Sequence, residues 1–335
     1  MSFKSFDLSQ DVASVVSSIN EVVSISGSLF AQDANVKFYN NISSSSVKLG
    51  GYWQTVFDSD VTSSLSTPIL DMTFGYAEGS AYNQPGSSYS SQNEKVKIYR
   101  MMASSLLGNP DSLFTINGES VSECFFIMVK RGIQKDELKK GTTSICLYSG
   151  STWLTASDAG ASVNFKQTVG GDYSPLYIVN SASKEVGQVW YNAGVLVLNA
   201  MNSASANYAF SNSSMWSGSN SMGTLQLSGT IDNLVDGLRD YVDKINFHNQ
   251  TNLYSTIYFC RATNTEFNYS SNPTFLDENK RIRVTSGSNI LQTRTYVTTA
   301  GLYDANDNLL AVAKVNKPLT KSPDTELTLR IRLDY

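Results

Sequence analysis

Apolar and polar positions alternate along residues 327–335, where every second side chain is apolar and the positions between are polar or charged. A period of two is typical of a strand with one buried and one wet face. Apolar runs at residues 296–303 and 309–315 precede it, separated by the Asx-rich turn 304–308. We predict that these three segments form a C-terminal antiparallel β-meander.

The central part of the chain, residues 25–228, alternates apolar runs with polar loops rich in Ser, Asn and Gly. The runs that we predict as strands are 69–76, 121–131, 142–147, 176–179 and 187–199. Residues 191–194 predict a hairpin turn inside the last run. Only residues 93–107 change period: apolar side chains recur there every three or four positions, and Gly108 follows as a helix stop. We therefore predict a β-rich main region with a helix near 93–107.

The first 24 residues carry apolar side chains at the spacing of one helix face, namely Val12, Val15, Val16, Ile19, Val22 and Val23. Valine loses rotamer freedom in a helix, so this pattern also suits an extended segment. Two alternatives stay open for residues 1–24: an N-terminal helix, or a docking arm that is ordered by contact with a neighbouring subunit or with the chain's own core.

A second helix is predicted over residues 231–247. Its apolar stripe and its Asp-rich stripe lie on opposite faces, and Thr230 is placed to cap its first turn. A Ser-rich stretch precedes this helix, so we predict a domain boundary at residue 229. The last domain, residues 229–335, then combines the helix with an antiparallel β-module. The fold class that follows is mainly β with a few helices (α+β), built of antiparallel β-sandwich-like modules.

The composition fits a folded, interface-forming β protein. Charged residues are 16% of the chain, the net charge is −4, and 18 Tyr accompany 15 Phe. Low charge argues against disorder, and Tyr combines apolar area with a polar tip. The acidic balance predicts no specific nucleic-acid binding. The basic residues near the C-terminus (Lys314, Lys317, Lys321, Arg330 and Arg332) fit a solvated strand face better than a binding patch. No apolar run is long enough to predict a membrane span.

Residues suited to catalysis are scarce. The single histidine, His248, follows the predicted helix, where an imidazole at a helix end is the simplest interpretation. Three cysteines, Cys124, Cys146 and Cys260, lie in separate apolar runs and predict buried free thiols, as expected of a protein folded in a reducing cytoplasm.

The paired carboxylates Asp58 with Asp60 and Asp304 with Asp307 fit turn caps. The chain also lacks the motifs of the common nucleotide, zinc and serine-hydrolase sites. We therefore predict no enzymatic activity and no catalytic, cofactor-binding or metal-binding residues.

Several phrases along the chain are similar to those of a known protein class. They are FKSFD at 3–7, ECFFIMVKR at 123–131, KDELKKGT at 135–142, EVGQVWYNAGVLVL at 185–198, RATNTEFNYSSNP at 261–273, and TTAGLYD with LLAVAK near the C-terminus. Together they resemble virion structural proteins of large contractile-tailed bacteriophages, notably those that infect marine cyanobacteria.

The resemblance implies a non-enzymatic component of the virion, of the tail or baseplate type, made and assembled in the cytoplasm of the bacterial host. Its expected partners are other virion proteins and copies of itself, with neither membrane nor specific nucleic acid. Two alternatives stay open. One is a head-side neck or capsid decoration protein. The other is a receptor- or glycan-binding module associated with a fibre, in which Trp153 or Trp216 would stack on sugars.

Overall fold

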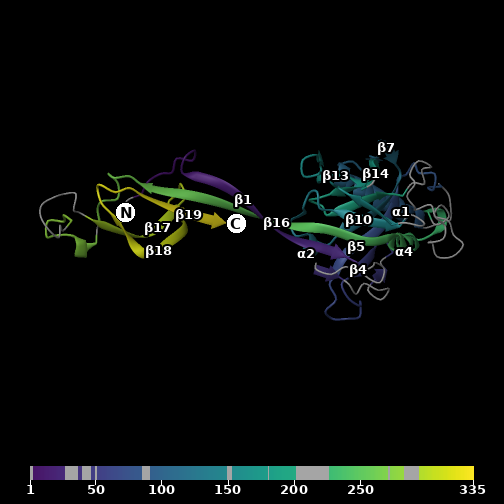
Figure 1. Ribbon diagram of the computed structural model, residues 1–335, viewed down its shortest axis with the longest axis horizontal. Helices are drawn as coiled ribbons and strands as arrows, with labels where there is room; N and C mark the ends of the chain where they lie inside the picture. The colour runs from purple at the N-terminus through teal and green to yellow at the C-terminus, as the bar shows by residue number, and fades with distance from the viewer. Residues whose placement is uncertain are drawn as a thin grey trace. The chain divides into compact units, whose positions relative to one another are not determined.

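The computed structural model describes residues 3–26, 37–39, 47–49, 51–84, 91–148, 153–179, 181–200, 226–270, 272–282 and 294–335 (Figure 1). The chain divides into two compact units. Unit 1 comprises residues 1–18 and 252–335, and unit 2 comprises residues 19–251. The division falls within two long strands, β1 (Val12–Ile25) and β16 (Val242–Ala262). The structure therefore corrects the predicted boundary at residue 229, because residues 229–251 belong to unit 2.

Strands make up 50% of the described residues and helices 14%, so the predicted mainly β fold class is confirmed. The further strands of unit 2 are β2 (Lys37–Tyr39), β3 (Val47–Leu49), β4 (Gln54–Phe57), β5 (Pro68–Tyr76), β6 (Phe114–Ile116), β7 (Glu119–Val121), β8 (Glu123–Val129), β9 (Glu137–Leu138), β10 (Ser144–Tyr148), β11 (Trp153–Ser157), β12 (Lys166–Thr168), β13 (Gly171–Ile178), β14 (Ser181–Trp190) and β15 (Val195–Asn199). Its helices include α1 (Ser91–Leu107), α2 (Arg131–Gln134) and α4 (Ile231–Tyr241).

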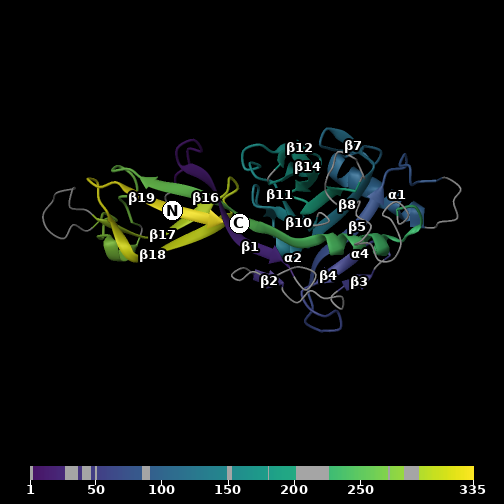
Figure 2. The ribbon, with the colours of Figure 1, turned by 45° about the vertical axis from the view of Figure 1, so that its right-hand side comes forward.

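Unit 2 is organised around a large curled sheet (Figures 1 and 2). Its central strands follow the order β10-β11-β13-β14-β15-β8-β5-β4-β3, and each neighbouring pair is antiparallel. The predicted hairpin turn at 191–194 is confirmed, since Trp190 pairs with Val195 across it. Gly194 closes this turn with φ +66°, a conformation that favours glycine.

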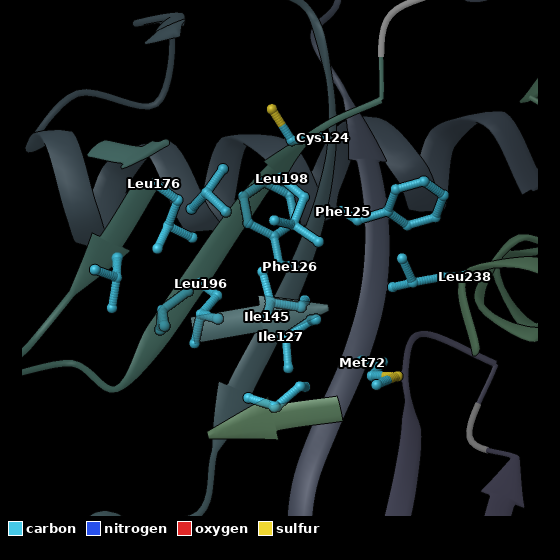
Figure 3. Close-up of a cluster of buried hydrophobic side chains, with 14 of the residues drawn as sticks. Met72, Cys124, Phe125, Phe126, Ile127, Ile145, Leu176, Leu196, Leu198 and Leu238 are labelled. Atoms are coloured by element: carbon cyan, nitrogen blue, oxygen red, sulfur yellow. The ribbon is translucent and has the colours of Figure 1, made fainter. Parts of the chain in front are cut away.

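The core of unit 2 lies on both faces of β5 and β8. Phe125 pairs with Phe74 on one face, and Figure 3 shows Leu238 of α4 on the side of Phe125. Gly75 belongs to the other face, where a Cβ would come within 2.7 Å of the Tyr99 backbone nitrogen of α1. The glycine thus lets α1 pack directly on the strand. Because two helices cover opposite faces, both strands are almost wholly apolar.

Unit 1 has a much smaller core. Its strands besides the ends of β1 and β16 are β17 (Thr295–Tyr303), β18 (Leu309–Lys321) and β19 (Leu327–Asp334), and a 3₁₀ turn, η2, spans Pro273–Phe275. β17 and β18 form an antiparallel hairpin, as predicted. β19 pairs with β16 instead of β18, so the third strand of the predicted meander joins a strand from earlier in the chain.

The sequence pattern also misplaced two elements. Residues 12–25 form a strand, so the helix alternative for residues 1–24 is wrong, and the β-branched valines account for the difference. The helix predicted over 231–247 ends at Tyr241, and β16 begins at Val242. Residues 242, 245 and 247 are all buried in this strand: residues 245 and 247 have strand spacing, and a register shift against β10 between residues 242 and 244 accounts for the odd spacing of residue 242. Thr230 caps α4 as predicted, its hydroxyl accepting from the Asn233 backbone nitrogen at 3.2 Å.

Candidate interaction surface

His248 lies inside β16, not at a helix end, so its predicted placement is wrong. Its backbone nitrogen donates to the Thr142 hydroxyl at 3.0 Å, and its carbonyl accepts from the Lys139 nitrogen. Burial, followed by the positive charge of Lys139, lowers the pKa of the imidazole. The histidine is thus neutral near physiological pH, and both of these hydrogen bonds involve its backbone and not its imidazole.

The three cysteines are free, as predicted, although only Cys124 is fully buried and Cys146 and Cys260 are half-buried. Burial is the main cause that raises the pKa of each thiol. A raised pKa keeps a thiol protonated and therefore poorly nucleophilic. None of the three has the electrostatic surroundings of a catalytic cysteine.

Asp60 and Asp304 cap turns, as predicted: Asp60 accepts from the Thr62 nitrogen at 2.9 Å, and Asp304 accepts from the Asn308 nitrogen at 2.7 Å. Asp58 instead closes a longer loop, accepting from the Thr67 nitrogen at 2.8 Å. Within the described residues, no group of three or more His, Cys, Asp and Glu side chains is placed to hold a metal ion.

The basic residues near the C-terminus do not form one surface. Lys321 is fully buried, and its ammonium donates to the Ser322 carbonyl at 2.8 Å, the Asn268 side-chain oxygen at 2.9 Å and the Asn264 carbonyl at 3.2 Å. All three donors of the ammonium are therefore satisfied by loop oxygens. The prediction that Lys321 lies on a solvated face was wrong, whereas the other four basic residues are exposed as predicted: Lys314, Lys317, Arg330 and Arg332.

Two buried polar groups in unit 2 escaped the sequence pattern. Asp158 accepts from the Gly141 and Thr143 nitrogens, both at 2.9 Å, and from the Tyr191 hydroxyl at 2.7 Å. Burial nevertheless raises its pKa. Lys95 of α1 donates to the Gln226 carbonyl at 2.7 Å, and burial lowers its pKa to about 8. Both groups therefore link separate segments of unit 2.

An exposed group of large apolar side chains lies on the outer face of the β17–β18 hairpin. Four large side chains near its turn are exposed by about half: Tyr303 46%, Leu309 52%, Leu310 65% and Val312 50%. Gly301 lies beneath them, and a Cβ there would meet the Tyr303 ring at 2.9 Å and Leu309 at 3.3 Å. The missing side chain therefore lets the Tyr303 ring lie flat on the sheet. We call Tyr303, Leu309, Leu310 and Val312 the hairpin patch.

The two faces of this hairpin are filled unevenly. Paired residues in antiparallel strands share a face. Leu302 pairs with Ala311 and Ala300 pairs with Ala313 on the inner face, so three of these four side chains are alanines. The outer face carries the hairpin patch. A β-hairpin that only served its own fold would place its larger apolar side chains inward, so this distribution indicates a surface that contacts another molecule.

The predicted stacking of Trp153 or Trp216 on sugars is not tested by the structure. Trp216 lies outside the described residues, and so does the side chain of Trp153, whose backbone belongs to β11. An exposed aromatic pair that the sequence did not single out is Tyr52 with Trp53, whose ring centroids are 6.4 Å apart. Trp53 is 44% exposed.

Comparison of this chain with protein-family models, with curated proteins and with solved structures finds no match. Among the described helices, none is long and apolar enough to cross a membrane. The function of the chain is therefore inferred from its own residues.

Proposed function

We propose that this protein is a non-enzymatic structural subunit of a bacteriophage virion, and that it belongs to the tail or baseplate. The observation that carries the structural role is the hairpin patch, which presents large apolar side chains to the outside on a unit with little core of its own. Such a surface is stabilised when a neighbouring subunit covers it. The phage context comes from the sequence resemblance described above.

The composition of the exposed side chains supports the same role. Subunit interfaces are enriched in Tyr and depleted of charge at their centres. Unit 1 exposes Tyr254, Tyr269, Tyr296, Tyr303 and Tyr335 by 46–77%. Each of these rings adds apolar area together with a hydroxyl that hydrogen-bonds partner groups or interfacial water.

A second candidate is the receptor- or glycan-binding module, and the Tyr52–Trp53 pair favours it. Half-exposed aromatic rings stack on sugar faces, and here the two rings are neighbours. The test is binding of the full chain to a panel of host surface glycans. Binding that is lost in Trp53→Ala and kept in the matched variant Leu65→Ala, another exposed residue of unit 2, would favour this function over a purely structural one.

Immunogold labelling of intact particles tests the leading proposal. Antibody raised against this chain should label the tail end of the particle, and antibody pre-absorbed with the purified chain should not. Label on the head or neck would overturn the tail assignment in favour of the head-side alternative. Particles that carry no label, and in which mass spectrometry finds no peptide of the chain, would overturn the virion role.

A further inference from the structure

The ends of the hairpin patch carry opposite charges. Asp307 lies in the turn between β17 and β18, with φ +63° and an exposed side chain. Lys314 and Lys317 follow the patch along β18 and are also exposed. Among the ion pairs found in the described part of unit 1, none includes Asp307, Lys314 or Lys317. The patch is thus an apolar centre with an acidic end and a basic end.

The outer face holds these groups in a fixed order. Thr299 pairs with Lys314 and Gly301 pairs with Val312, so Lys314, Val312 and the Gly301 position share one face. From Leu309 to Lys314 the strand extends about 17 Å at the usual rise per residue. Acidic and basic ends are therefore well separated, and a partner experiences them as two distinct charges.

We propose that the hairpin patch binds the same patch of a second copy of this chain, around a two-fold axis that lies between the two hairpins and across their strands. This inference deepens the proposed structural role and rests on it, because it names the partner of that surface. A two-fold axis makes residue i of one copy contact residue j of the other, and j contact i. The acidic turn of each copy then lies against Lys314 of the other.

Charge complementarity selects a second copy over other partners. A partner of uniform charge would be attracted at one end of the patch and repelled at the other. The same surface turned by 180° matches both ends at once. Its apolar residues also match, because the sequence midpoint between Asp307 and Lys314 falls at Leu310 and Ala311, next to the centre of the patch. Two hairpins packed in this way resemble the facing sheets of a β-sandwich.

The size of the patch sets the expected strength of the contact. Contiguous apolar patches of about 300–600 Å² mark interaction sites, whereas a stable interface buries about 800 Å² on each partner. Four half-exposed side chains fall near the lower of these values. They form the apolar centre, the charged ends form the rim, and the pair dissociates reversibly in dilute solution. Many copies held in one particle would strengthen each contact through their high local concentration.

Sedimentation velocity of the full chain over a range of concentrations tests the pairing. The wild-type chain should form a reversible dimer. Leu310→Asp should weaken it at least tenfold, because a carboxylate would be buried at the centre of the contact. Asp307→Lys and Lys314→Glu should each weaken it by about threefold to tenfold at low salt. The variant that carries both changes should recover wild-type affinity to within about twofold, since each end again meets its opposite charge.

Leu65→Asp is the matched control, since Leu65 is 85% exposed on unit 2 and its substitution should leave the dimer unchanged. Circular dichroism verifies that each variant is folded, and Val312→Lys replaces Leu310→Asp if that chain is unfolded. A wild-type chain that stays monomeric up to its solubility limit overturns the pairing. So does a dimer that Leu310→Asp or Val312→Lys leaves intact, or one in which the double charge reversal does not recover affinity.

The immunogold experiment and the sedimentation experiment can overturn their two proposals independently. A chain that is present in the particle but monomeric in solution overturns the pairing and leaves the structural role standing. A chain that is absent from the particle but dimerises through Leu310 overturns the virion role, and the dimer is then a property of the free protein.

Discussion

Unit 2 and unit 1 are built from similar strands but distribute their apolar side chains differently. The contiguous hydrophobic core lies wholly within residues 19–251. Within the described part of unit 1, the buried hydrophobic side chains are only Ile257, Leu302 and Ile331. The described part of unit 2 therefore has an extensive apolar core, while that of unit 1 buries few apolar side chains. The difference teaches that a fold can be β-rich throughout and still concentrate its hydrophobic core in one part.

The largest expected effect comes from the core of unit 2. Leu238 is fully buried against the sheet, so Leu238→Ala should lower the free energy of unfolding by about 2–5 kcal/mol. Leu310→Ala in unit 1 is the matched control. Because Leu310 is 65% exposed, its cost should stay within about 0.5 kcal/mol. Urea denaturation at a protein concentration low enough to keep the chain monomeric measures both losses of unfolding free energy. Equal losses would contradict the contrast between the two units.

The stability of unit 2 should depend on pH through the titration of Lys95. Its pKa in the folded chain is lowered to about 8 from 10.5, so the unfolded chain binds more protons between these values. Stability should therefore rise with pH above about 8, by about 1–2 kcal/mol between pH 8 and 9.5. Above pH 10 the buried Tyr76, whose pKa is raised to about 12, has the opposite effect. Urea denaturation across pH 7–9.5 measures the slope.

Lys95→Met is the control for that measurement. It retains the apolar stem, removes the titrating group and should abolish the rise in stability between pH 8 and 9.5. A slope that persists in Lys95→Met would assign the pH dependence to another group.

In unit 1 the corresponding buried cation is Lys321. Lys321→Met leaves the three oxygens around the ammonium, of which that of Ser322 belongs to a buried residue, without this donor, and should cost about 1–3 kcal/mol. The loss should appear locally, as faster amide hydrogen exchange in residues 263–268, whose oxygens hold the ammonium. Lys314→Met, at an exposed position of the same strand, should leave this exchange unchanged. Unaltered exchange in Lys321→Met would show that the loop is held by other contacts.

The smallest effect is expected at the polar edge of unit 2. Asp236 accepts from the Gln54 side chain at 2.9 Å and from Arg239 at 2.8 Å, and is itself 46% exposed. Asp236→Ala should therefore cost up to about 1 kcal/mol. A loss as large as that of Leu238→Ala, measured by the same urea denaturation, would mean that polar contacts and not the apolar core set the stability of α4.

The local sequence pattern was sufficient to predict elements that are stabilised by residues close to them in the chain. The helix at 91–107 and the hairpin around residues 191–194 were both predictable, because period and turn chemistry agree there. Residues 242–247 were not, since their apolar spacing continues that of the helix and fits a strand only with the register shift between residues 242 and 244. The choice is made by distant partners, as Ile245 pairs with Ile145 of β10.

The candidate surface depended on information that the sequence pattern did not contain. Which face of the β17–β18 hairpin points outward is decided by packing, and an alternating strand leaves it open. Lys321 is similar: a lysine near exposed lysines suggests a wet face, yet the register places it opposite the buried Thr295. The signal that could have found the patch is the run of alanines at 300, 311 and 313, which leaves the inner face small.

All four tryptophans of the chain, at positions 53, 153, 190 and 216, lie within residues 19–251. Intrinsic tryptophan emission therefore reports on unit 2 alone and is blind to any local opening of unit 1. Trp190 is fully buried and stacks on Tyr173 with centroids 4.9 Å apart, so its emission should shift to the red when that core opens. Replacing Tyr303 by Trp would place a fifth tryptophan, the first in unit 1, on the hairpin patch. In a Trp53→Phe background, the blue shift of that fluorophore on burial would follow subunit association without any added label.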